Sequence, residues 1–223
     1  LYAEFDAAAG PDITPPLPPP PPPAATSCDG NVVTDPGGDA THPLFASTAG
    51  PYDQVDTTAV NFAVDEAKTT LTTTLTIQNF TPQPITGSLG TYYYTTWTSA
   101  TRNADGTVTT RNYATRAAVN VQGAVSYSFG QYDQANDTFV GTTSVVTGSF
   151  TTGANGTLKV NVPLALLDHP TIPVTSTTAL PAVIEPYAVT IIHEQAVRFL
   201  MPADRAPNVG NFGASWAVCL PPP

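Results

Sequence analysis

The sequence has very little positive charge. It contains 7 lysines and arginines against 17 aspartates and glutamates, which gives a formal net charge of −10 at pH 7. Nucleic acids and anionic membranes attract proteins through basic patches that displace counterions from phosphates. We therefore expect neither a nucleic acid nor an anionic membrane surface as a partner.

Long apolar runs are also missing. No segment of the sequence approaches the roughly 20 apolar residues that a membrane-spanning helix needs. This pattern predicts no membrane insertion. The chain starts at Leu1 without a methionine or a signal-type apolar segment, which is typical of a mature or trimmed product.

Cysteine is nearly absent. The chain has two cysteines, Cys28 and Cys219, and neither has neighbours typical of a metal site. One disulfide between them, within one chain or between subunits, is our prediction, and two unpaired buried thiols are the alternative. A disulfide favours an oxidising compartment, so we expect an extracellular protein, secreted or at a cell surface.

Signatures of catalysis are absent as well. The sequence contains no nucleophile elbow, phosphate-binding Walker loop or dinucleotide-binding glycine pattern. His193 and Glu194 begin like a zinc-protease motif, but Val197 stands where the second histidine belongs. His193 also alternates with Val189 and Ile191, so we expect it to face the core. We predict that the chain is not an enzyme.

What the sequence has instead is alternation of apolar and polar residues, punctuated by turns. This period is that of half-buried β-strands. The pattern predicts an all-β fold, a single β-sandwich of jelly-roll or immunoglobulin-like type with about nine strands. The expected strands are 59–65, 69–79, 90–98, 107–115, 117–129, 138–150, 158–162, 187–200 and 214–219. We assign the sandwich to residues 28–223.

Residues 1–27 form a separate, proline-rich arm. Leu1, Ala3 and Phe5 alternate with polar or aromatic residues, as in a short strand. The following prolines predict polyproline II, which would span about 28 Å from Pro15 to Pro23 at roughly 3.1 Å per residue. A strand on so stiff a spacer does not fold back as a tight hairpin, so Leu1, Ala3 and Phe5 are candidate subunit contacts.

Aspartates gather in a turn-rich region before the first long strand. Asp35, Asp39 and Asp53 are our candidate ligands for a structural calcium ion, because hard cations prefer carboxylate and carbonyl oxygens from such loops. The spacing does not match an EF-hand loop. Turn chemistry alone explains the segment DPGGD equally well, so both interpretations stay open. No other cofactor is expected.

An aromatic row occupies the expected strand 90–98. Alternation places Tyr92 and Tyr94 on one face and Tyr93 and Trp97 on the other, so one pair should belong to the core. The exposed pair has three interpretations, which are cross-strand packing, a subunit contact or a carbohydrate-binding surface.

Three segments together resemble a known type of domain. They are DPGGDA at 35–40, VNFAVDEAKTTLTTTLTIQNF at 60–80 and GTLKVNVPLALLDHP at 156–170. They are similar to a β-sandwich domain of bacterial secreted proteins, which is appended to extracellular proteases and surface proteins. The resemblance covers about residues 30–219 and implies an extracellular, non-catalytic module. It identifies no functional residues.

Two functional hypotheses follow. The first is a structural subunit of an extracellular filament or surface assembly, a homopolymer in which Leu1–Asp6 of one copy adds a strand to its neighbour. The second is a non-catalytic accessory module of a secreted bacterial enzyme, with carbohydrate as a candidate ligand and the proline run as a linker.

Overall fold

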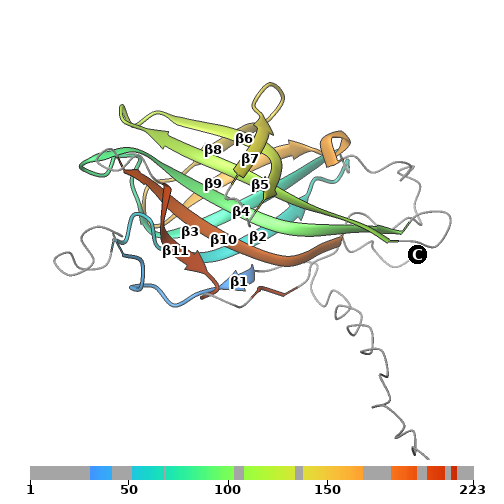
Figure 1. Ribbon diagram of the computed structural model, residues 1–223, viewed down its shortest axis with the longest axis horizontal. Helices are drawn as coiled ribbons and strands as arrows, with labels where there is room; N and C mark the ends of the chain where they lie inside the picture. Colours follow the sequence, from blue (N-terminus) through green and yellow to red (C-terminus); the bar gives the residue numbers. More distant parts are fainter. Residues whose placement is uncertain are drawn as a thin grey trace, which may run out of the picture.

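The computed structural model is a sandwich of two antiparallel β-sheets (Figure 1). It describes residues 31–41, 52–67, 69–102, 108–133, 138–167, 182–194, 200–208 and 212–214. The strand order is β1-β2-β3-β9-β8 in the five-stranded sheet and β11-β10-β4-β5-β6-β7 in the six-stranded sheet. The predicted all-β sandwich is therefore confirmed.

Eleven strands and one short helix make up the described elements. The five-stranded sheet contains β1 (Asn31–Thr34), β2 (Thr57–Val64), β3 (Thr70–Phe80), β8 (Thr147–Phe150) and β9 (Gly153–Pro163). The six-stranded sheet contains β4 (Ser88–Arg102), β5 (Val108–Asn120), β6 (Val125–Asp133), β7 (Thr138–Thr142), β10 (Ala182–Glu194) and β11 (Leu200–Ala206). The 3-10 helix η1 (Leu164–Leu167) follows β9. Nowhere in the described residues is there a helix with the length and apolar character needed to cross a membrane.

The core lies between the sheets and is built by strict alternation. In β3, Leu71, Thr73, Leu75 and Ile77 are buried, while Thr72, Thr74 and Thr76 on the other face are half-buried. Trp97 of β4 packs edge-on against Phe62, with ring centroids 5.3 Å apart. It also stacks on Phe129 of β6 at 6.0 Å. Each such side chain contributes about 1.5–3 kcal/mol through burial, so these inward rows hold the two sheets together.

The aromatic row of β4 divides as the alternation predicts. Tyr93 and Trp97 belong to the core between the sheets. Tyr92 and Tyr94 belong to a second apolar cluster with Tyr187 and Ile191. Ile192 of β10 faces the inner core, whereas Ile191 lies in the second cluster. The expectation that His193 and its alternating neighbours face the core is therefore wrong, because the row on the other side of β10 does so.

The expected strand 117–129 is two strands with a hairpin between them. The Asn120 side chain accepts hydrogen bonds from the backbone amides of Gln122 and Ala124, and Gly123 adopts a left-handed φ of 77°. Asparagine and glycine are the residues that such turns favour. The inward valines on the two sides of the turn, Val119 and Val125, both have odd residue numbers. The apolar alternation therefore continues across the hairpin, and alternation alone gives no sign of the turn.

Two further expected strands have different bounds. The segment 138–150 divides into β7 in one sheet and β8 in the other, with the chain crossing between sheets at 143–146. The segment 187–200 is replaced by β10 and β11, which are antiparallel neighbours. The arm 1–27, with its candidate contacts Leu1, Ala3 and Phe5, and the cysteines Cys28 and Cys219 lie outside the described residues.

Candidate functional site

The sandwich has two lateral sides of different chemistry. Strand β2 lies opposite β10 and β11, whereas β8 and β9 lie opposite β6. The edge strands β1 and β11 therefore share one side, at the bottom of Figure 1, and β7 and β8 share the other, at the top. We call these the β1/β11 side and the β7/β8 side.

Backbone hydrogen bonds from loops cover the β1/β11 side. The Thr41 amide donates to the Ala203 carbonyl of β11 at 2.9 Å. The Ala214 amide donates to the Val32 carbonyl of β1 at 2.7 Å, and the neighbouring Gly213 amide donates to the Pro186 carbonyl at 2.8 Å. Because loops use carbonyls of both edge strands, this side is less available to an added strand.

A cluster of carboxylates lies on the same side. One carboxylate oxygen from each of Asp35, Asp39 and Asp204 lies within 4.8 Å of the other two. Asp35 and Asp39 follow β1 in the loop DPGGD, and Asp204 belongs to β11. The cluster thus joins the end of one sheet to the edge strand of the other.

Asp204 reaches the cluster because of its place on β11. It pairs with Thr190 of β10 and is 8% exposed. Its Oδ2 accepts a hydrogen bond from the backbone amide of Thr57, at the start of β2, at 2.7 Å. The hydroxyls of Thr57 and Thr190 are also in hydrogen-bonding contact at 3.3 Å. These bonds connect the two sheets directly beside the carboxylates.

A fourth aspartate, Asp56, lies beneath the loop. It is fully buried, and its Oδ2 accepts a hydrogen bond from the backbone amide of Gly38. Gly38 has a left-handed φ of 98°, a conformation that favours glycine. A Cβ at Gly37 would collide with the side-chain carbonyl of Gln78. The left-handed conformation of Gly38 is therefore what lets the loop turn over Asp56.

The carboxylates sit in an environment that disfavours their charged forms. Burial raises the pKa of Asp204 to about 7, and the negative charges of Asp56, Asp39 and Asp35 act in the same direction. The amide of Thr57 opposes that rise. Burial is also the main cause that raises the pKa of Asp35 and of Asp56. Among the described residues, the charges acting on these three groups all come from other aspartates, so they raise each other's pKa.

The structure brings together part of the predicted calcium set. Asp35 and Asp39 are in the cluster, whereas Asp53 lies outside the group of three. The Asp53 backbone carbonyl accepts a hydrogen bond from the Asn79 amide, and its charge raises the pKa of Asp56. Sequence reasoning did not single out Asp204, because only the pairing of β11 with β10 places it here. Its signal was an acidic residue between Ala203 and Arg205, directly after the apolar run FLMPA.

The β7/β8 side has no charge on its edge strands. The sequences of β7 (TFVGT) and β8 (TGSF) contain neither a charged residue nor a proline. Val140 of β7 is 78% exposed, and Val145 and Phe150 are 50% and 41% exposed. Natural edge strands are usually protected by charges, prolines or bulges. This side lacks such protection within the described residues.

A groove of about 460 Å³ opens beside β7. Tyr113 and Phe129 form its floor and stack on each other at 5.4 Å. The Tyr113 hydroxyl donates to the Leu167 carbonyl at 2.7 Å, which holds η1 at the end of the groove. The remaining lining residues are Arg111, Gly130, Gln131, Val140, Gly141, Thr142 and Leu166.

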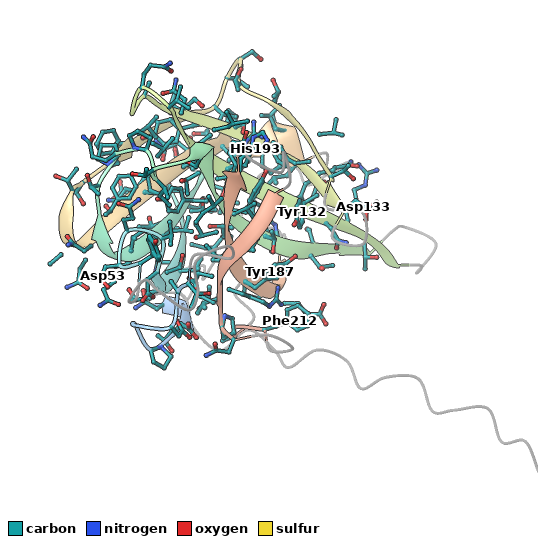
Figure 2. The ribbon with its side chains drawn as sticks, turned by 60° about the vertical axis from the view of Figure 1, so that its left-hand side comes forward. Asp53, Tyr132, Asp133, Tyr187, His193 and Phe212 are labelled. Atoms are coloured by element: carbon teal, nitrogen blue, oxygen red, sulfur yellow. The ribbon has the colours of Figure 1, made fainter. Side chains whose placement is uncertain are left out.

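The outer face of the six-stranded sheet is aromatic. Figure 2 labels Tyr132, Tyr187 and Phe212 along this face, while Asp53 lies on the other side of the view. A small cavity of about 130 Å³ is lined by these three rings together with Thr96, Trp97, Thr98, Asn112, Tyr113 and Glu185. The guanidinium of Arg205 lies 4.0 Å from the ring centre of Tyr187, a cation–π contact. Phe212 is the exposed ring of the three, at 45%.

Comparison with known proteins assigns the chain to none of them. No protein family, curated protein or solved structure matches the sequence or the fold significantly.

Proposed function

We propose that this chain is a structural subunit of an extracellular assembly, in which one copy donates Leu1–Asp6 to the β7 edge of the next copy. The observation that carries the proposal is the uncharged β7 edge, with Val140 78% exposed beside an apolar groove. An added strand gains main-chain hydrogen bonds along such an edge, and pockets between its side chains give specificity.

The two partners of this contact match in length and pattern. Strand β7 has five residues, and the arm offers six, with Leu1, Ala3 and Phe5 on one side. The same parity lets all three apolar side chains face the groove at once. Burying a leucine or phenylalanine side chain contributes about 1.5–3 kcal/mol, so two such anchors stabilise a specific contact.

Polymerisation follows from the geometry of the contact. The donating and accepting surfaces are different parts of the same chain, so the contact is heterologous and produces a ring or an open fibre. The proline run supplies the reach between two bodies, because polyproline II is stiff and extended.

Electron microscopy of the purified full chain tests the proposal. We expect filaments or rings from the full chain and none after deletion of residues 1–12. Val140→Asp should also abolish them, because the edge valine would become a charge that resists an added strand. Val121→Asp is the matched control, since Val121 is another exposed valine, at 43%, in the β5–β6 hairpin.

A mixing experiment separates donor from acceptor. The deletion variant can accept but not donate, and Val140→Asp can donate but not accept. An equimolar mixture should therefore give a discrete heterodimer in size-exclusion chromatography, while each variant alone stays monomeric. Filaments that persist without residues 1–12 would sink the proposal.

A second candidate function is a carbohydrate-binding accessory module. The cavity on the outer sheet face supports it, because aromatic rings and the polar side chains of Asn112 and Glu185 line the same small space. A pull-down with insoluble polysaccharides tests this function. Phe212→Ala should remove binding, and Phe150→Ala is the control, because Phe150 is similarly exposed at 41% but lies on β8.

A further inference from the structure

We infer that Asp35, Asp39 and Asp204 form a calcium site that joins the two sheets on the β1/β11 side. This site is independent of strand donation at β7 and lies on the opposite edge of the sandwich. Its carboxylates come from two separate segments, which are the loop after β1 and strand β11.

The spacing of the oxygens fits one calcium ion. Oxygens bound to Ca²⁺ lie about 2.3–2.6 Å from the metal, so two of them are at most about 5 Å apart. The oxygens of Asp35, Asp39 and Asp204 lie within 4.8 Å of one another. All three are carboxylate oxygens, the donor type that hard cations prefer.

Buried oxygens without hydrogen-bond partners are the second observation. Asp56 is fully buried, and its Oδ1 has no partner although Oδ2 accepts from the Gly38 amide. Asp35 is 9% exposed, and its Oδ2 has no partner although Oδ1 accepts from the Asn208 side chain at 3.3 Å. A buried polar atom left unsatisfied costs about 1–3 kcal/mol, and more when the group is charged. A bound cation removes that cost.

Among the described residues, the charges that act on Asp35, Asp56 and Asp204 are all negative. The closest basic residue along the chain, Arg205, holds its guanidinium over the Tyr187 ring on the outer face of the sheet. The buried side-chain carbonyl of Gln78, beside Gly37 of the same loop, also has no hydrogen-bond partner.

Calcium suits the site better than magnesium. Mg²⁺ requires near-octahedral geometry at about 2.0–2.1 Å and usually keeps several waters. Three carboxylates from one loop and one strand form an irregular set, and Ca²⁺ accepts 6–8 oxygens in flexible geometry. The exposed side of Asp39 leaves room for waters to complete the shell and for the ion to enter.

Calorimetric titration of the metal-free full chain with CaCl₂ tests the inference. We expect one Ca²⁺ per chain, and a clearly weaker heat with MgCl₂. Asp39→Asn removes the exposed ligand, so it leaves the fold intact and lowers Ca²⁺ affinity by at least about tenfold. Asp53→Asn is the matched control, an aspartate of the same loop region outside the cluster, and should change the affinity less than about threefold.

Thermal unfolding gives an independent readout that does not need an intact assembly. Ca²⁺ should raise the melting temperature of the wild type and of Asp53→Asn, and raise it much less for Asp39→Asn. Absence of both heat and a melting shift would overturn the inference and leave protons shared among the carboxylates as the explanation of the cluster. Equal binding of Mg²⁺ and Ca²⁺ would overturn the choice of calcium. Loss of binding in Asp53→Asn alone would overturn the ligand set.

Discussion

The edge strands on the two lateral sides of this sandwich differ in how their unpaired backbone groups are covered. On the β1/β11 side, loop amides bond to Val32 and Ala203 of the edge strands, and acidic groups gather beside them. On the β7/β8 side, the edge strands have no charge, and Val140 is 78% exposed. The first arrangement suits intramolecular closure, and the second suits contact with another chain. Within the described residues, loops therefore cover one edge of the fold and not the other.

The largest expected effect is a pH dependence that comes from the β1/β11 side. Burial raises the pKa of Asp204 to about 7 from 3.8, so the metal-free folded state binds a proton that the unfolded state has already released. The free energy of unfolding therefore falls as pH rises from about 4 to about 7, by up to about 4 kcal/mol. Urea unfolding in metal-free buffer at each pH measures this slope.

Two comparisons sharpen that measurement. Saturating Ca²⁺ should flatten the dependence of the unfolding free energy on pH, because it binds the ionised carboxylates. Asp204→Asn should flatten the same dependence in the absence of any metal. The lowered pKa of Asp65, caused mainly by its hydrogen bond with the Thr69 hydroxyl, acts in the opposite direction and only below about pH 4. Stability that rises between pH 4 and pH 7 in metal-free buffer would contradict the prediction.

A steric change on β6 should weaken the β7/β8 side alone. A Cβ at Gly130 would collide with the Val140 carbonyl and the Gly141 backbone of β7. Gly130→Ala should therefore cost about 1–3 kcal/mol of unfolding free energy and speed hydrogen exchange of the β7 amides. Gly87→Ala is the control, because a Cβ there meets nothing within 4 Å and only its φ of 85° resists alanine. Normal protection of β7 in Gly130→Ala would show that the β6–β7 pairing tolerates the side chain.

Two buried tyrosines provide a matched pair across the molecule. The Tyr93 hydroxyl donates to the Gln54 carbonyl at 2.8 Å, near Asp56, and the Tyr113 hydroxyl donates to the Leu167 carbonyl at 2.7 Å, near the groove. Either tyrosine-to-phenylalanine change should cost about 1 kcal/mol in urea unfolding. Only Tyr93→Phe should also weaken Ca²⁺ binding, because its bond holds the loop that contains Asp56. Equal effects of both changes on Ca²⁺ affinity would contradict the expectation that the β1/β11 side and the β7/β8 side act independently.

The smallest effect on stability is expected where the effect on assembly is greatest. Val140→Asp should change the unfolding free energy by less than about 0.5 kcal/mol, because the side chain is already 78% exposed. The same variant should prevent assembly. Urea unfolding of the Val140→Asp monomer, made in the chain without residues 1–12, measures the first value. A loss of more than about 2 kcal/mol would mean that Val140 supports the fold itself.

The alternation of residues predicted most of the fold, and its failures have a common cause. Alternation specifies which residues share a face, so it separated Tyr93 from Tyr94, and it places Leu71, Leu75 and Ile77 of β3 in one buried row. Alternation cannot reveal a hairpin when the apolar residues keep the same odd or even positions on both sides of the turn. This is why the turn at Asn120 was not predicted. It also cannot decide which of two apolar faces of a doubly covered strand is the inner one, as in β10.

The candidate site was predicted in part for a related reason. Asp35 and Asp39 lie in one short loop whose glycines make a tight turn, and local chemistry is enough to bring them together. Asp204 joins them only through its pairing opposite Thr190 and the packing of β11 over the start of β2. Such a contact depends on strand order, which sequence periodicity does not encode.

For this protein, the sequence by itself determined an acidic all-β chain, its inward-facing rows and its turn chemistry, because these follow from local periodicity and from the conformations that glycine, asparagine and proline prefer. Only the tertiary structure decided which edges lie together, that Asp204 completes the aspartate cluster, and that β7 is an edge strand beside a groove among the described residues. The physical reason is that strand order and sheet packing arise from contacts between residues far apart in the chain.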